Sequence, residues 1–259
     1  NLMASSMFLI GVAMLYGVTG KLNMADMAIM VPAIPEDDRG LLHAGAAILA
    51  VAFLVKAAAW PLNFWLPSAY SAAAAPVSAL FAIMTKLGVY AILRVWTLLF
   101  PQDAGVSALF GGPVLVGLGL ATLTFGIIGV IASQHLNRMV AFCAIVSSGT
   151  LLAALGFGQP AVTGGALYYT LGSTLAVSAF FLLTELIDRT REVEENPIYV
   201  SEVEPDDSFA YPVDLVPVRD VNLDDDEEAL FGRAIPAAMA FLGLAFIVCG
   251  LTIAGLPPM

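Results

Sequence analysis

Two lysines lie in the middle of long apolar stretches of the chain. Lys56 falls near the centre of residues 41–70, and Lys86 near the centre of residues 76–100. A lysine at the centre of a membrane-spanning helix costs roughly 2.5–3.5 kcal/mol, whereas each leucine returns only about 0.5 kcal/mol. Because burial favours the neutral form of an amine, we interpret both lysines as proton carriers that face a hydrated bundle interior. The alternative is a structural lysine that reaches the membrane surface or pairs with one carboxylate.

Further polar residues follow Lys86 at helical spacing. Tyr90 and Arg94 lie four and eight residues later, which places all three on one slowly drifting helix face. This face is a possible polar path out of the membrane. Arg94 lies close enough to the end of the stretch, however, that its side chain can simply reach the interface.

A second polar line lies in the apolar stretch 139–157. Cys143, Ser147 and Thr150 recur at helical spacing, and Ser148 lies beside them. We include Ser147 and Ser148 in the possible polar path, because hydroxyl groups can support water. Small and hydroxyl residues also pack helices together, so a purely structural role is the alternative.

The elements that must position these side chains are membrane-spanning helices, each of about 20 mostly apolar residues. Alternation typical of strands is missing from the sequence, so we predict an all-α polytopic bundle. Pro61 cannot donate a backbone hydrogen bond, so we expect a helix break just after Lys56. Gly255 and Pro257 mark a second break. Seven stretches qualify as spans: 2–19, 41–70, 76–100, 113–133, 139–157, 161–186 and 234–254.

Composition supports this fold class. Apolar residues make up 59% of the chain and charged residues 12%, against roughly 45–50% and 25% in soluble domains. The net charge of −11 is concentrated in residues 187–232, which we predict to be an acidic, solvated cytoplasmic loop. The predicted organisation is therefore about six spans in residues 1–186, this loop, and a further span in residues 233–259 that is cut off at a helix break. We expect the chain to be a fragment. Nucleic acid is not an expected partner, and no metal site or organic cofactor is predicted.

The segments FLVKAAAWPLNFWLPSAY and APVSALFAIMTKLGVYAILR resemble the antiporter-like family shared by complex I membrane subunits and Mrp-type antiporters. QHLNRMVAFCAIVSSG and AGLPP resemble two further family segments. Within the family, YGVTGKLNMADMA, VSSGTLLAALGFGQPAVTGGALYY and IPAAMAFLGLAFIVCGLTIAGLPP look most like the D subunits of Mrp/Pha-type cation/proton antiporters. Complex I relatives often have histidine where this chain has Tyr70 and Ser148, so the resemblance does not imply a histidine relay here.

The resemblance implies a fold of two inverted five-helix repeats, each with one broken helix. It implies a transporter subunit, not an enzyme, in the plasma membrane of a prokaryote, where it exchanges protons for Na⁺ or K⁺ together with other antiporter subunits. Protons would pass along lysines and water, with a glutamate before Asn1 and a further lysine after Met259 taking part. The first alternative is a proton-pumping membrane subunit of an NADH:quinone oxidoreductase. The second is a membrane scaffold without a transport role.

Overall fold

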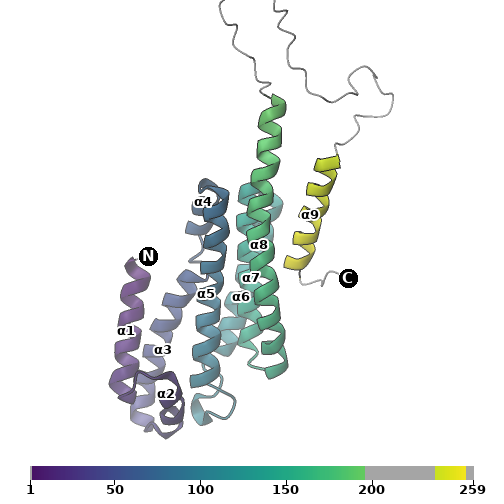
Figure 1. Cartoon of the computed structure of the whole chain (residues 1–259). Coiled ribbons are helices and arrows are strands. Elements are labelled where there is room, and N and C mark those ends of the chain that lie inside the picture. Colours follow the sequence, from purple (N-terminus) through teal and green to yellow (C-terminus); the bar gives the residue numbers. More distant parts are fainter. Residues whose placement is uncertain (1, 196–236, 255–259) are drawn as a thin grey trace, which may run out of the picture.

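The computed structural model describes residues 2–195 and 237–254, and every regular element in these ranges is a helix (Figure 1). This confirms the predicted all-α class. Six helices are long and apolar enough to cross a membrane, and α9, with 17 residues, is a shorter apolar helix. The elements are α1 (Leu2–Thr19), α2 (Met24–Met30), η1 (Val31–Ala33), α3 (Glu36–Lys56), α4 (Trp65–Ala72), α5 (Ala75–Leu99), η2 (Gly105–Ser107), α6 (Gly112–Ala132), α7 (Leu136–Gly156), α8 (Pro160–Glu195) and α9 (Ala237–Ile253).

The helix starts follow from residue chemistry. Helices α5 and α6 each have a proline in their first two positions, Pro76 and Pro113, where the missing N–H would have no partner within the helix anyway. Helix α3 follows Pro35 and carries Glu36, Asp37 and Asp38 in its first turn. Negative charges there interact favourably with the positive end of the helix dipole. Local sequence therefore accounts for where these three spans begin.

The break predicted after Lys56 is confirmed, because α3 ends at that residue and α4 begins only at Trp65. The chain leaves α3 through Ala58, whose φ of 53° lies in the left-handed region. The Ala58 amide donates to the Val55 carbonyl at 3.3 Å, and the Ala59 amide donates to the Leu54 carbonyl at 3.0 Å. These two bonds form a Schellman-type helix end, which satisfies carbonyls that would otherwise be unpaired. The second predicted break, at Gly255 and Pro257, lies outside the described residues.

Two features differ from the sequence-based expectation. The short helix α2, whose Asn23 side chain caps its start, was not predicted. Helix α8 does not end near residue 186, because it continues to Glu195. Residues 187–195 contain no glycine or proline and are rich in Glu and Arg, which favour helix. The first part of the predicted acidic loop is therefore helical, while residues 196–232 of that loop lie outside the described residues.

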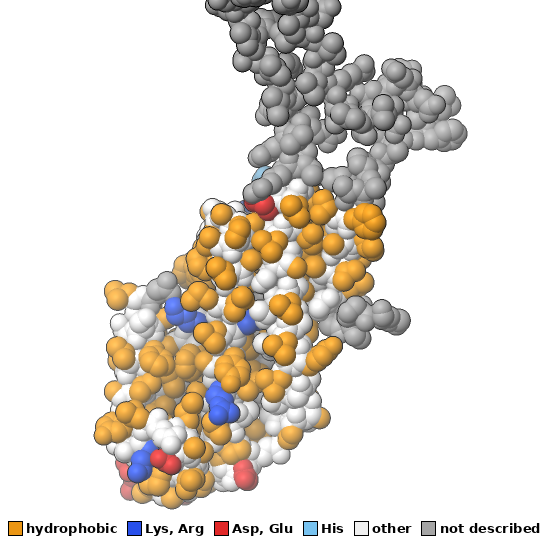
Figure 2. Space-filling model, in the orientation of Figure 1, with side chains coloured by type: hydrophobic (Ala, Val, Ile, Leu, Met, Phe, Trp, Pro, Cys, Tyr) orange, Lys and Arg blue, Asp and Glu red, His pale blue; other side chains and the backbone are white. Residues whose placement is uncertain are grey.

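The helices form a bundle in which α5 packs against α3, α7 and α8, and α6 packs against α7 (Figure 1). Helix α7 is the most enclosed, with 67% of its span buried against 22% for α6. On the face shown in Figure 2, hydrophobic side chains cover most of the bundle and charged side chains form small isolated spots. This surface suits a nonpolar solvent. Buried polar side chains include Lys86 on α5 and Ser147 and Ser148 on α7.

Helices α6 and α7 approach closely because glycine replaces larger residues along their interface. A Cβ atom added at Gly119 would lie 2.3 Å from the Ala153 backbone nitrogen. In membranes, where no hydrophobic effect drives helices together, such close backbone packing is a main source of helix association. The glycine therefore helps to determine how deeply α7 sits in the bundle.

We predict that Gly119→Ala destabilises the protein by roughly 1–3 kcal/mol, the usual cost of overpacking a tight site, because backbone atoms must move apart. The measurement is the thermal unfolding midpoint of the purified protein in detergent. Gly117→Ala is the matched control on the same helix, since an added Cβ there meets nothing within 4 Å. Equal midpoints for the two variants would contradict this account of the interface.

Candidate proton-transfer site

Lys86 lies inside the bundle, where α5 faces α7. Its side chain is only 4% exposed. The ammonium group donates to the Ser147 hydroxyl and, at 3.5 Å, to the Ser148 hydroxyl. Within the described part of the chain, these two neutral groups are its hydrogen-bond partners. The structure therefore brings together three of the residues that the sequence singled out, and it surrounds the lysine with hydroxyls.

The serines lie in the interior because α7 is the enclosed helix. Both Ser147 and Ser148 are fully buried. The Ser147 hydroxyl donates to the Ala144 carbonyl at 3.2 Å, so its oxygen lone pairs remain available to the lysine. A hydroxyl both donates and accepts, which makes this pair of serines suitable for passing a proton to or from Lys86.

Lys56 occupies a different environment, at the end of α3. It is the last residue of that helix, and its side chain is exposed on the described part of the chain. The C-terminal carbonyls of a helix carry partial negative charge, which stabilises a cation in the last turn. The helix break therefore reduces the cost of placing a positive charge at this depth, which a continuous helix would not do.

At Gly88, close to Lys86 on α5, the helix packs tightly against the end of α3 at Lys56. Gly88 was not among the residues predicted from the sequence. An added Cβ at Gly88 would lie 2.7 Å from the Ala57 nitrogen and 3.1 Å from the Lys56 Cβ. Gly88 stands two residues after Lys86, so α5 touches the end of α3 on one side and binds α7 through Lys86 on another. An isolated glycine inside an apolar helix was the available sequence signal, because such a position often reflects a packing requirement.

Helix α4 is attached to α5 by hydroxyl groups next to Lys86. The Tyr70 hydroxyl donates to the Phe81 carbonyl at 2.6 Å and contacts the Thr85 hydroxyl. The Ser78 hydroxyl donates to the Tyr70 carbonyl at 2.7 Å. Tyr70 is 2% exposed, so at this position a buried tyrosine orders the second half of the broken helix. Thr85 and Ser78 were not among the predicted site residues.

The break itself contains buried polar groups. The Trp60 amide donates to the Thr122 hydroxyl on α6 at 2.8 Å, which fixes the connecting segment that contains Pro61. The side-chain N–H groups of Asn63 and Trp65 are buried and have no acceptor among the described residues. The interrupted helix is thus a polar region within an apolar bundle.

Tyr90 and Arg94 do not share the buried surroundings of Lys86. Both are exposed, and they line a separate groove of about 420 Å³ with residues of α1, α2 and α3, including Leu49 and Phe53. The helix face drifts by roughly 40° over each four residues, so the three side chains diverge. The structure therefore does not place Lys86, Tyr90 and Arg94 along one common path.

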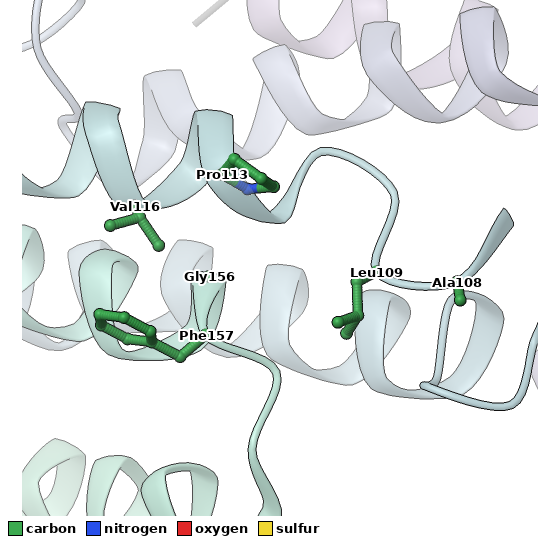
Figure 3. Close-up of a pocket in the computed structure, with 6 residues that line it drawn as sticks. All are labelled: Ala108, Leu109, Pro113, Val116, Gly156 and Phe157. Atoms are coloured by element: carbon green, nitrogen blue, oxygen red, sulfur yellow. The ribbon is translucent and has the colours of Figure 1, made fainter.

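The larger hollow, of about 690 Å³, is not the site. Figure 3 shows the six residues that line it, in the segment before α6, at the start of α6 and at the end of α7, and none of them is ionisable. Gly156 lies eight residues from Ser148 along α7, or about 12 Å. In the described ranges, no three His, Cys, Asp or Glu residues are grouped so that they could hold a metal ion.

Residues 1–201 match the family model described as NADH:quinone oxidoreductase/Mrp antiporter, transmembrane. The chain belongs to this family of membrane proteins. Over all 259 residues it is 48% identical to a protein of Rhizobium meliloti named as the probable D subunit of a K⁺/H⁺ antiporter, of which it covers 46%. It is 38% identical to the Na⁺/H⁺ antiporter D subunit of Bacillus subtilis, over 71% of this chain and 36% of the relative.

Another relative belongs to the respiratory branch of the family. The NADH-quinone oxidoreductase N subunit of Desulforudis audaxviator is 36% identical over 70% of this chain and 35% of its own length. The chain thus spans less than half the length of these curated relatives.

Two solved structures share the fold. The Mrp complex from Dietzia sp. DQ12-45-1b aligns with a TM-score of 0.63 and 29% identity, over 71% of this chain and 33% of that one. An archaeal membrane-bound sulfane sulfur reductase aligns with a TM-score of 0.64 and 28% identity. The alignment covers 70% of this chain and 36% of the reductase chain. The fold is therefore one that antiporter and respiratory complexes share.

We predict that Gly88→Ala displaces the end of α3 and lowers the thermal midpoint of the purified protein, because the added methyl group meets backbone atoms at Ala57. The expected cost is roughly 1–3 kcal/mol. Gly164→Ala on α8 serves as the control, since an added Cβ there meets open space. A Gly88→Ala protein as stable as this control would show that the contact between α5 and the end of α3 is not tight.

Proposed function

We propose that this chain is the central part of the D subunit of a monovalent cation/proton antiporter in a prokaryotic plasma membrane. In this proposal the subunit works with other antiporter subunits and moves protons through Lys56, Lys86 and internal water. A relative that is 48% identical over the whole chain carries the name of a K⁺/H⁺ antiporter subunit, so K⁺ is the first cation to test and Na⁺ the second.

The burial of Lys86 against neutral partners supports this proposal most strongly. A structural cation in a membrane interior is normally paired with a carboxylate, because an isolated buried charge is costly. Lys86 instead contacts Ser147 and Ser148. Hydroxyls can accept from the charged amine and donate to the neutral one, so they accommodate both protonation states. This is what a group that repeatedly gains and loses a proton requires.

Water entry is assigned to the break between α3 and α4. The buried N–H groups of Asn63 and Trp65 are suited to hold water, since polar groups in a membrane interior need internal partners. Lys56 ends the helix on one side of this break, and α4 with Tyr70 begins the other side. A proton that enters here would reach Lys56 first and Lys86 afterwards.

The first alternative is a proton-pumping subunit of an NADH:quinone oxidoreductase, which the relative from the respiratory branch favours. Proton movement would then be driven by a redox arm, so the two functions differ in their energy source. A scaffold without transport is the second alternative, in which the lysines serve only structure. Residues 196–232, the remainder of the acidic segment after α8, are proposed to lie in the cytoplasm in all three cases.

The decisive experiment uses inside-out vesicles that contain the full-length protein with its partner subunits. We expect K⁺ or Na⁺ to dissipate a preformed pH gradient without NADH and without quinone reduction. Vesicles from cells that lack the protein are the control. A gradient that responds only to NADH oxidation, together with copurification of redox subunits, would establish the respiratory alternative instead.

A second prediction separates proton carriers from structural cations. Arginine stays protonated, so Lys56→Arg keeps the charge but removes the ability to titrate. We expect this variant to assemble at near-normal levels, measured by the yield of purified complex, while cation/proton exchange is largely lost. Lys86→Met tests the buried lysine with a side chain of similar length that has no charge to bury, and exchange should again be lost from an assembled complex.

The control for both variants is Thr124→Val, which removes an exposed hydroxyl on α6 that donates to the Leu120 carbonyl of its own helix. It should leave exchange unchanged. If assembled Lys56→Arg protein exchanges at close to the full rate, Lys56 contributes only a fixed positive charge and does not carry protons.

A further inference from the structure

A tyrosine on α8 holds the end of α9. The Tyr169 hydroxyl donates a hydrogen bond to the carbonyl of Ile253, 84 residues away in the sequence. Ile253 is the last residue of α9 and is 6% exposed. The contact therefore joins the interior side of α8 to the end of another helix.

The bond satisfies a group that the membrane would otherwise penalise. The last four carbonyls of a helix have no partner within the helix, and a nonpolar surrounding offers none. Helix α9 also packs on α8 through Phe180 and Phe246, whose rings stack with centroids 4.2 Å apart. That aromatic contact lies near the middle of α9 and is apolar, whereas the Tyr169 bond is a directional contact at the helix end.

The same hydroxyl faces the polar line of α7. Tyr169 packs against the buried cluster that contains Leu151 and Leu152 of α7, and Thr150, the preceding residue of α7, lies near its hydroxyl. Thr150 follows Ser147 by one helical turn, and Ser147 binds Lys86. Tyr169 therefore stands between the α7 hydroxyls that lead from Lys86 and the terminal carbonyls of α9.

We propose that Tyr169 is a positioning residue, whose hydroxyl holds the end of α9 against the polar line of α7 so that the proton path from Lys86 continues to α9. The proposal rests on the proposed function and extends it beyond α7. Phenylalanine at this position keeps the ring and its packing but releases the Ile253 carbonyl. The end of α9 then loses its fixed distance from Thr150.

The test compares Tyr169→Phe with Tyr168→Phe in the full-length complex. Tyr168 is the adjacent residue and is 74% exposed, so its variant removes the same hydroxyl from the outer surface. We expect Tyr169→Phe to assemble normally and to lower the maximal exchange rate roughly five- to ten-fold, the factor that corresponds to one lost neutral hydrogen bond. The cation concentration for half-maximal rate should not change. Tyr168→Phe should match the unmodified complex in both quantities.

A second readout reports on α9 without transport. Cys249 lies on α9 one turn before Ile253 and is partly buried. In a complex whose other cysteines are replaced, including Cys143→Ala, a membrane-permeant maleimide should label Cys249 several-fold faster when Tyr169→Phe is present. Tyr168→Phe should not change the labelling rate.

The outcomes of these two measurements separate the role of Tyr169 from the proposed function. Full exchange by Tyr169→Phe overturns the positioning role while the proposed function stands. Reduced exchange with unchanged Cys249 labelling also overturns it, since α9 would not have moved. If the unmodified complex shows no exchange, the proposed function fails, and equal labelling of the two tyrosine variants would then overturn the contact between Tyr169 and α9 as well.

Discussion

A nonpolar solvent supplies no hydrogen bonds, so every polar group in the bundle depends on a partner from the protein or from internal water. This constraint explains why the polar contacts of the described chain gather on a few faces. The ammonium group of Lys86 is bound by two serine hydroxyls of α7, and the Trp60 amide at the helix break is bound by Thr122. The apolar exterior follows from the same constraint, because side chains that face lipid need no such partners.

Helix α5 links the parts of this arrangement. One of its faces binds α7 through Lys86, another lies against the end of α3 at Gly88, and its hydroxyls at Ser78 and Thr85 contact Tyr70 of α4. Movement of α3 or α4 would therefore be transmitted to the surroundings of Lys86. Under the proposed function, such coupling would let the protonation of one lysine influence the next.

The break after α3 lowers the cost of the charge on Lys56, which the composition of the helix alone would not suggest. A charge in the middle of a continuous helix faces a ladder of satisfied carbonyls, whereas a charge in the last turn faces carbonyls with partial negative charge. The break thus converts an unfavourable position into a tolerable one, and the left-handed Ala58 redirects the chain within a short distance. Helix α6 packs closely on α7, the helix that carries Ser147 and Ser148, where Gly119 meets the backbone of Ala153.

The sequence by itself determined the fold class, the six long apolar helices and the first helix break, because apolar length and proline chemistry are local properties. It also singled out Lys56 and Lys86, since a charge in an apolar stretch is visible without a structure. Only the tertiary structure decided which residues surround them. Ser147 and Ser148 meet Lys86, whereas Tyr90 and Arg94 turn to a separate groove, because small rotations along α5 accumulate with each turn. Gly88, Thr85 and Tyr169 act through partners on other helices, and such long-range contacts leave no pattern in the spacing of residues along the chain.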